Sequence, residues 1–412
     1  MRNAYSHTVQ CCNSAKLRPR CVVQPRSTSK VAIAVKALVD ADQAFAIRAG
    51  DHMNWAGSNN INNGATIDLG LLKETTYDVA AGTADTSLGA KWKDVYEELE
   101  KDGRVVAGGR EAEVGAGGFL LDGGNTFYGL GHDFACDNIV AYEVHNAGEH
   151  QDLFQVLKGE GNNFWVVTKI TLKTLLSGPI WDGFAALPAA AEAVADFTAR
   201  ASGDRDSTLN LTVCHIPRLG GAAVVCAARR YSQVLTYTSL STDHYNVWYT
   251  LCFKNDVSII SKATELYRVL AKQAEEKVTD GDFTAYLSLQ PIPRLYSQHS
   301  VAAGGNMFGL ENYTHDATFI QASIRVWTSE LTEWAGPVVR ETVDGIHEYA
   351  AAVIDGICPF LYLNYANPEQ KVLESYGGNS LDKMRNVSSK YDPTGAFQRL
   401  CPGGFKLANV KS

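Results

Sequence analysis

Apolar residues in the first third of the chain occur either at helical spacing or in short runs. Helical spacing after Ser27 predicts a helix over residues 27–40, and two further helices are predicted over residues 91–101 and 152–158. Short apolar runs predict strands at residues 21–23, 45–48, 65–69, 104–107, 138–144 and 164–175. We therefore expect an α/β or α+β domain that closes near Ser177.

The middle of the chain, from Pro179 to about Val338, contains longer β-rich runs. They predict an antiparallel sheet with strands at residues 209–214, 222–229, 246–253 and 318–327, flanked by helices over residues 190–201 and 258–277. The last part predicts helices over residues 330–354 and 380–391, with an apolar strand at residues 360–365 between them. The whole chain is therefore expected to be of the α+β class.

Composition and charge narrow the classes of partner. The chain has 412 residues, enough for two or three domains at about 150 residues each. Acidic residues outnumber basic ones by 45 to 37, and no basic run forms a stripe, so nucleic acid is not an expected partner. No apolar stretch reaches the roughly 18 residues that span a bilayer, and residues 1–20 lack the apolar core of a secretory signal, so we expect no membrane association. The compartment stays undecided.

Two glycine-bearing segments could carry chemistry. Residues 48–52, Arg-Ala-Gly-Asp-His, follow a predicted strand, where they could form a phosphate-binding loop with a nucleophilic histidine. Taken alone, this segment is more often an ordinary turn at the end of a strand. Residues 108–131 are dense in glycine, which indicates either close approach of the backbone to a cofactor or a set of turns. The histidines at 132, 145 and 150 lack metal-ligand spacing, and no metal is predicted.

Several segments occur together in one order and spacing. They are residues 48–57, 108–118, 135–138, 152–154 and 161–164, followed near the carboxyl end by residues 362–366, 375–377 and 391–406. This combination resembles the FAD-linked oxidases with a vanillyl-alcohol-oxidase (PCMH) type flavin domain, in particular their fungal berberine-bridge-enzyme-like branch. The resemblance implies a two-subdomain PCMH-type FAD-binding domain over residues 15–178 and an antiparallel-sheet substrate domain, covered by helices, over residues 179–345. Residues 346–412 would return to the flavin domain.

The resemblance also implies site residues. The loop from Arg48 to Met53 would wrap the FAD pyrophosphate, and His52 would be linked to the 8α-methyl group of the flavin. Glu111 stands where bicovalent relatives have a second linking cysteine, so we expect one covalent bond at most. The implied cofactor-binding residues are Arg48, Ala49, Gly50, Asp51, His52, Met53, Gly115, Gly117, Gly118, Asn138 and Asn364.

Two tyrosines are the implied catalytic residues. Tyr365 would take the hydroxyl proton of the substrate, and Tyr362 would place a second aromatic hydroxyl over the flavin. A phenol titrates near ~10, so Tyr365 needs a basic neighbour or a positive field, and the sequence does not identify that neighbour. Without the resemblance, core packing would be the favoured interpretation for both tyrosines.

The chain departs from the family pattern at three places. Ala49 and Asp51 replace glycines of the phosphate loop, and Asp51 would bring a negative charge beside two phosphates. Asp122 replaces a further glycine. The segment from Val144 to Asp152 is shorter than in relatives by roughly a hairpin arm, and we expect this to weaken the flavin domain.

The expected function is that of an FAD-dependent oxidoreductase. It would oxidise a C–H bond of an alcohol, sugar or secondary metabolite by hydride transfer to flavin N5, with O2 as the acceptor. Its partners would be the small-molecule substrate and O2, and the protein would be a monomer. The alternative is a non-catalytic binding protein of the same fold that has lost its flavin.

Overall fold

The protein is represented by a computed structural model that describes residue 14 and residues 16–144, 150–178, 190–203, 205–217 and 244–411. The predicted strand at 222–229 and most of the shortened segment between Val144 and Asp152 lie outside these ranges. None of the described helices is both long enough and apolar enough to cross a membrane.

The chain begins with a small parallel sheet. Its strands are β1 (Cys21–Val23), β2 (Phe45–Arg48) and β3 (Ala65–Asp68), in the order β1-β3-β2. Parallel strands need a crossover, and α2 (Thr28–Asp40) supplies it after the Ser27 hydroxyl caps its first turn. The predictions for these elements are confirmed to within a residue, and the end of β2 carries the candidate phosphate loop.

A second sheet with short helices completes the first body of the molecule. Its strands are β4 (Thr75–Asp78), β5 (Thr83–Ser87), β6 (Arg104–Val106), β7 (Ile139–Val144) and β8 (Val167–Leu176), and its helices are α3 (Trp92–Leu99), α4 (Ala116–Leu121), α5 (Gly129–His132) and α6 (Gln151–Val156). The long strand β8 pairs with β5, β6 and β7. The hairpin of β4 and β5 was not predicted, because its residues are mostly polar.

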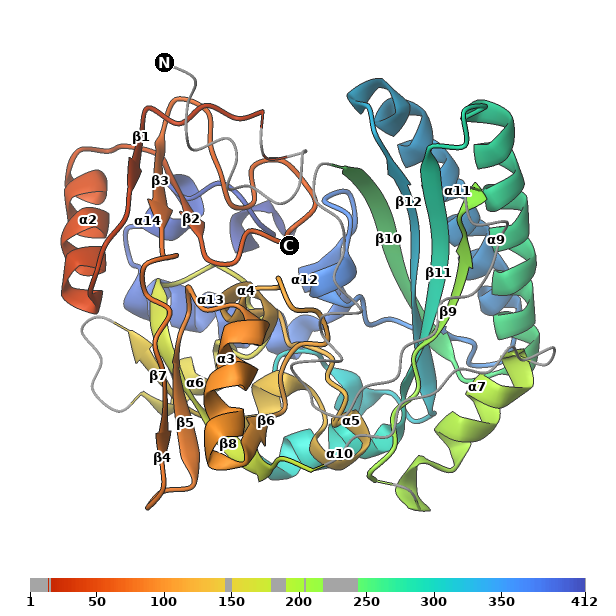
Figure 1. Cartoon of the computed structure of the whole chain (residues 1–412), viewed down its shortest axis with the longest axis horizontal. Coiled ribbons are helices and arrows are strands. Elements are labelled where there is room, and N and C mark those ends of the chain that lie inside the picture. Colours follow the sequence, from red (N-terminus) through yellow and green to blue (C-terminus); the bar gives the residue numbers. More distant parts are fainter. Residues whose placement is uncertain are drawn as a thin grey trace.

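The second body is an antiparallel sheet with helices on one face (Figure 1). The strands are β9 (Leu211–His215), β10 (Tyr245–Lys254), β11 (Phe283–Ile292), β12 (Ala317–Val326) and β13 (Ile357–Cys358), in the order β13-β10-β12-β11-β9. The helices on that face are α7 (Ala190–Ala199), α9 (Val257–Lys277) and α11 (Ser329–Ala352), whereas α10 (Arg294–Ala302) packs against α5 of the first body. The predicted antiparallel sheet with flanking helices is confirmed.

Side chains of β11 show why one face of this sheet is free for function. Phe283, Ala285, Leu287 and Leu289 are buried in one apolar cluster with residues of α9 and α11. The alternate residues carry polar groups and point to the opposite face, namely Thr284, Tyr286, Ser288 and Gln290. Strand β11 is absent from the sequence prediction although this alternation is visible in the sequence.

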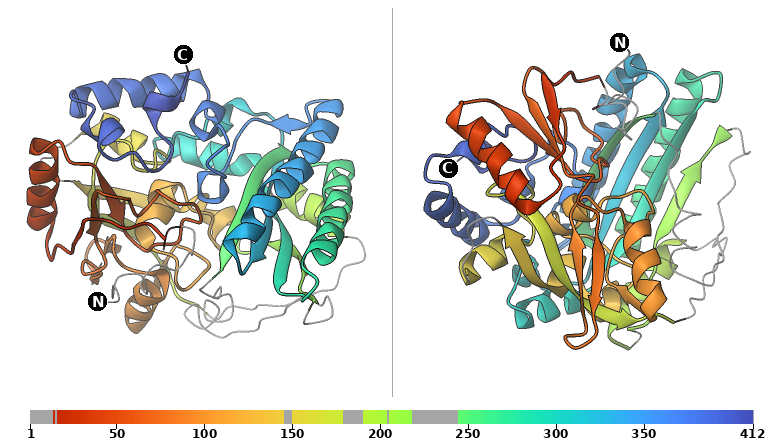
Figure 2. Two further views of the ribbon diagram at one scale, coloured as in Figure 1. Left: turned by 90° about the horizontal axis from the view of Figure 1, so that it is seen from above. Right: turned by 60° about the vertical axis from the view of Figure 1, so that its left-hand side comes forward.

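The carboxyl-terminal segment crosses back to the first body. Helices α13 (Gly378–Tyr391) and α14 (Ala396–Arg399) lie with that body and away from the antiparallel sheet (Figure 1 and Figure 2). The residues just before α12 (Val372–Ser375) still contact the sheet, where the Gln370 amide donates to the Thr250 carbonyl of β10 at 2.7 Å. Phe397 packs edge-on against Phe45 of β2, with ring centroids 5.9 Å apart. The segment therefore helps to close the core beneath the parallel sheet.

The predicted strand at residues 360–365 is wrong. In this part of the chain, only β13, which precedes the predicted strand, pairs with the antiparallel sheet. Leu363–Tyr365 forms a 3-10 turn in which the Tyr365 amide donates to the Tyr362 carbonyl at 3.0 Å. The apolar run is buried because its aromatic rings pack into the junction of the two bodies, and Phe134 stacks on Tyr362 at 6.1 Å. Burial by ring packing produced the strand-like pattern without ladder pairing.

Candidate active site

A large cavity lies between the polar face of the antiparallel sheet and the loops that follow β2 and β6. Its volume is about 1070 Å³, at the upper end of the roughly 300–1,000 Å³ of ordinary ligand pockets. Most of the predicted site residues line it, namely Ala49, Gly50, Asp51, His52, Met53, Gly115, Gly117, Gly118, Tyr362, Asn364 and Tyr365. Folding therefore brings the amino-terminal loop, the glycine-rich stretch and the carboxyl-terminal tyrosines to one place.

Two predicted residues make other contacts and do not line the cavity. The Arg48 guanidinium is buried and donates to the Asp68 carboxylate at 2.9 Å, which ties the end of β2 to the end of β3. The Asn138 amide donates to the carbonyls of His132 and Phe134 at 2.5 and 3.1 Å. Both side chains brace the loops around the cavity.

Two glycines allow the cofactor loop and the glycine-rich stretch to touch. A Cβ atom on Gly50 would lie 2.1 Å from the Gly115 Cα atom, and one on Gly115 would lie 2.3 Å from the Gly50 Cα atom. Only residues without side chains permit this backbone crossing. The adjacent Asp51 has φ of 61°, a left-handed conformation that glycine adopts without strain. Asp51, which replaces a glycine of the family pattern, is thus accommodated with backbone strain, and it still lines the cavity.

Asp122, the other acidic replacement, lies in the wall of the cavity. Burial raises the pKa of Asp122 well above its ordinary value, and the neighbouring Glu160 raises it further. Burial likewise raises the pKa of Glu160 to about 8. Both shifts favour the neutral acids, which lessens the negative charge at Asp122 in the wall of the cavity and at Glu160 behind it.

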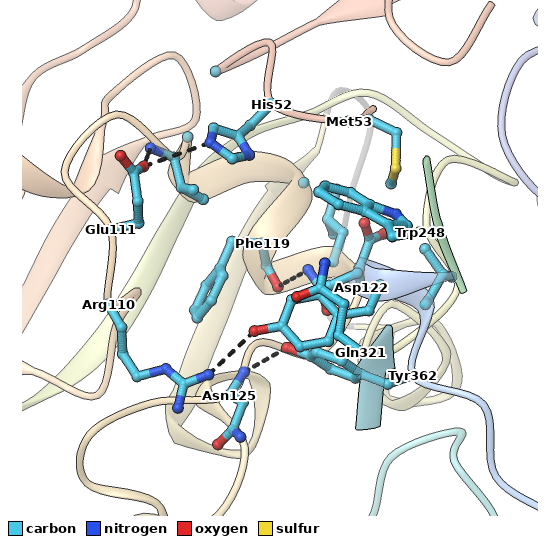
Figure 3. Close-up of a pocket in the computed structure, with 18 of the residues that line it drawn as sticks. His52, Met53, Arg110, Glu111, Phe119, Asp122, Asn125, Trp248, Gln321 and Tyr362 are labelled. Carbon is cyan, nitrogen blue, oxygen red and sulfur yellow. Dashed lines mark hydrogen bonds and ion pairs between the residues drawn. The ribbon is translucent and has the colours of Figure 1, made fainter. Parts of the chain in front are cut away.

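His52 lies at the cavity wall and faces Glu111 (Figure 3). Its Nε2 atom is 3.6 Å from the Glu111 carboxylate, and that carboxylate accepts the backbone N–H groups of Glu113 and Val114 at 2.8 and 2.7 Å. Burial lowers the pKa of His52, and the charge of Glu111 opposes this shift. The neutral imidazole, which can act as a nucleophile, is therefore favoured.

Tyr365 has the positive neighbour that its proposed role requires. The Arg110 guanidinium donates to the Tyr365 hydroxyl at 3.2 Å and to the Gln290 side-chain carbonyl at 2.5 Å. Gln290 also donates to Tyr365 at 3.4 Å and accepts from the Asn125 amide at 2.8 Å. Arg110, Gln290 and Asn125 were not among the predicted site residues. Arg110 closes the Gly-Gly-Arg motif at residues 108–110, whereas Gln290 lies on the unpredicted strand β11.

Tyr362 has a different environment. It is 1% exposed, and its hydroxyl accepts the backbone N–H of Asn125 at 2.5 Å. Burial raises the pKa of Tyr362 well above its ordinary value. Tyr362 is thus held as a neutral phenol. Asn364 links the same wall to the glycine-rich stretch through the Phe119 carbonyl and the Gly124 amide, each at 3.4 Å.

The roof of the cavity is the polar face of the antiparallel sheet. Its lining side chains include Trp248 from β10, Thr284, Tyr286, Ser288 and Gln290 from β11, and Gln321 and Arg325 from β12. Arg325 is oriented by its Nε atom, which donates to the Asn246 side chain at 3.0 Å. Amides, hydroxyls and aromatic rings of this kind bind polar organic molecules by hydrogen bonding and stacking.

The wall also contains polar groups that fit a cofactor. Both polar atoms of the Asn59 side chain are buried and have no hydrogen-bond partner among the residues that the structure describes, and the same holds for the indole Nε1 atoms of Trp55 and Trp165. All three residues line the cavity. Buried polar groups are normally satisfied, so these indicate a ligand that supplies the partners. In the described part of the chain, no group of three His, Cys, Asp or Glu side chains could hold a metal ion.

Known proteins are similar to this chain in sequence and in fold. The FAD binding domain family matches residues 19–151. The FAD-dependent monooxygenase drtC of Aspergillus calidoustus is 31% identical over 446 residues, covering 96% of this chain and 84% of that protein. The fold is similar to 6-hydroxy-D-nicotine oxidase from Arthrobacter nicotinovorans, with a TM-score of 0.74 at 18% identity over 96% of this chain and 94% of that one.

A second solved structure with the same fold has a known covalent flavin. It is the glucooligosaccharide oxidase from Acremonium strictum, with a TM-score of 0.70 at 15% identity over 96% of this chain and 94% of that one, and it carries a 6-S-cysteinyl, 8α-N1-histidyl FAD. The α+β fold class with a PCMH-type flavin domain is confirmed. Taken with the sequence identity over nearly the whole length, these similarities show that the chain belongs to the FAD-linked oxidoreductases with a PCMH-type FAD-binding domain, in their fungal berberine-bridge-enzyme-like branch.

Proposed function

We propose that this FAD-dependent oxidoreductase oxidises a C–H bond of a small hydroxylated molecule and uses O2 as its electron acceptor. The observation that carries the proposal is the Tyr365 hydroxyl beside Arg110, on the same cavity as the His52 loop. When bound there, FAD supplies the electron acceptor for the reaction, because its N5 atom takes a hydride from the substrate.

Two backbone segments and the side chains of Asn59 and His52 would hold the cofactor. The backbone of Gly50 to Met53 and of Gly115 to Gly118 forms a close cradle, and the unpartnered side chain of Asn59 offers both a donor and an acceptor. His52 would carry one covalent bond to the 8α position through its N1 (Nδ1) nitrogen, by analogy with the glucooligosaccharide oxidase. Glu111 is not a cysteine, so a second bond is not proposed.

Tyr365 would accept the proton of the substrate hydroxyl. Arg110 lies 3.2 Å from its oxygen and would stabilise the negative charge that develops there. Gln290 also donates to the same hydroxyl at 3.4 Å. Tyr362 would shape the wall through its bond to Asn125 and not act as the base, because its hydroxyl is buried and already accepts a hydrogen bond.

The polar roof supports a hydroxylated metabolite as substrate. Side chains from Thr284 to Gln290 alternate toward the cavity and offer amide and hydroxyl groups, and Trp248 offers a stacking surface. An alcohol, a sugar or a fungal secondary metabolite fits this chemistry, and the secondary metabolite is our first proposal. The protein is proposed to act as a monomer.

Two measurements test the proposal. The purified protein should be yellow, with flavin absorbance near ~370 and ~450 nm, and flavin should stay with the polypeptide after acid precipitation. His52→Ala should leave the flavin dissociable. A colourless protein that also fails to take up added FAD would favour the flavin-free binding protein instead.

A third measurement separates oxidation from oxygen insertion, since the fungal relative drtC is named a monooxygenase. With isotopically labelled O2, the proposed oxidase forms labelled hydrogen peroxide and an unlabelled product. Label in the organic product would refute O2 as a simple electron acceptor.

A further inference from the structure

His52 and Glu111 form a half-buried pair that the proposed oxidation does not use. Their side chains are 24% and 13% exposed, and the Glu111 carboxylate lies 3.6 Å from His52 Nε2 (Figure 3). Two backbone N–H groups, of Glu113 and Val114, hold that carboxylate in place. The carboxylate is thus fixed before any ligand binds.

The contact distinguishes the two ring nitrogens of His52. A distance of 3.6 Å is longer than a hydrogen bond of about 2.7–3.2 Å, but contacts in ligand-free sites often tighten when the cofactor binds. A carboxylate beside Nε2 favours the tautomer with its proton on Nε2, because a carboxylate accepts and cannot donate. Nδ1 then keeps its lone pair.

We propose that Glu111 is a positioning residue for covalent attachment of the flavin: it holds the Nε2–H group of His52 and leaves Nδ1 as the nitrogen that bonds to the 8α carbon. This rests on the attachment through His52 proposed above. The arrangement follows the logic by which a carboxylate orients a catalytic histidine in hydrolases.

The attachment step balances with O2 as oxidant. The Nδ1–carbon bond forms, one C–H bond of the 8α-methyl group breaks, and the proton on Nε2 is finally lost. Two electrons and two protons are therefore removed, and O2 takes them up as hydrogen peroxide. While Nδ1 is bonding and Nε2 still holds its proton, the imidazole carries positive charge, which the Glu111 carboxylate stabilises before it accepts that proton.

The experiment measures the rate of attachment separately from catalysis. Protein produced with limited riboflavin is mixed with FAD, and flavin that resists acid precipitation is followed over time. In Glu111→Gln the total FAD bound should be retained, because the amide oxygen can still accept the backbone N–H groups. The rate of covalent attachment should fall at least ~10-fold, since the carboxylate's charge and basicity are lost. Glu111→Asp keeps a carboxylate and should recover part of the rate.

The pH dependence of the attachment rate is a second measurement, and it would not change if Glu111 had a purely structural role. Burial lowers the pKa of His52 most, and Arg325 and Lys91 lower it further, whereas Glu111 and a backbone hydrogen bond of His52 raise it. Removing the carboxylate should therefore shift the midpoint of the rate profile to lower pH. Glu98→Gln is the matched control, because that carboxylate pairs with Lys101 at the exposed end of α3.

Each outcome bears on the proposal. Attachment in Glu111→Gln at the wild-type rate and with the wild-type pH midpoint would overturn it while leaving attachment through His52 intact. A wild-type protein that binds FAD and oxidises substrate but holds no covalent flavin would overturn both this inference and the attachment, but not the proposed oxidation. Nitrogen-15 NMR of His52 in the flavin-free protein gives an independent answer, because a proton on Nδ1 in place of Nε2 would also overturn the inference.

Discussion

The crossing of the two cofactor loops can be tested by adding one methyl group at three glycines. At Gly118, in α4, an added Cβ atom would meet only an Asp122 carboxylate oxygen, at 4.0 Å. At Gly50 and Gly115 it would lie 2.1 and 2.3 Å from the backbone of the other glycine. The same substitution is therefore tolerated at one position and obstructed at the other two.

The expected changes in melting temperature have opposite signs. Alanine is favoured over glycine in a helix by at most about 1 kcal/mol, so Gly118→Ala should raise the melting temperature of this 412-residue chain by at most about 1 °C. Gly50→Ala or Gly115→Ala requires the two backbones to separate, and such overpacking costs about 1–3 kcal/mol or more. Their melting temperature should fall by at least about 1 °C.

Flavin content gives the second readout. Gly118 lines the cavity and its position is exposed, so a methyl group there should weaken FAD binding even though it stabilises the polypeptide. The assay compares melting temperature without flavin and FAD binding by absorbance, in a His52→Ala background that keeps the flavin removable. Unchanged stability in Gly50→Ala would refute the close crossing, and full FAD affinity in Gly118→Ala would refute passage of the cofactor over Gly118.

Two further predictions concern the base and the buried acids. Tyr365→Phe should slow flavin reduction by ~100-fold or more while substrate binding changes little. Arg110→Met should slow flavin reduction as well. Stopped-flow reduction of Tyr365→Phe at the wild-type rate would remove Tyr365 from the mechanism. Burial and the nearby Asp137 raise the pKa of Asp133 to about 8, so the folded state binds a proton that the unfolded chain releases above about 4, and stability should fall as pH rises between these values. Asp133→Asn should flatten part of this fall in melting temperature between pH 5 and pH 8, and an unchanged slope would show that Asp133 does not hold that proton.

Much of the fold followed from local patterns in the sequence. The helix from Thr28 to Asp40 and the strand from Phe45 to Arg48 were predicted because capping and apolar spacing act over a few residues. The polar hairpin of β4 and β5 gave no such signal, and the run from Phe360 to Tyr365 gave a misleading one, since aromatic burial in an irregular segment resembles a buried strand.

The candidate site divides in the same way. Motif order in the sequence pointed to the loop of His52 and to Tyr365, because short segments that touch a cofactor keep their residue types together. The neighbours of these residues were decided by tertiary structure alone: Arg110 meets Tyr365 across 255 positions of sequence, and Glu111 meets His52 from a separate loop. Such contacts depend on how strands and loops are placed in space, and no local periodicity records that placement.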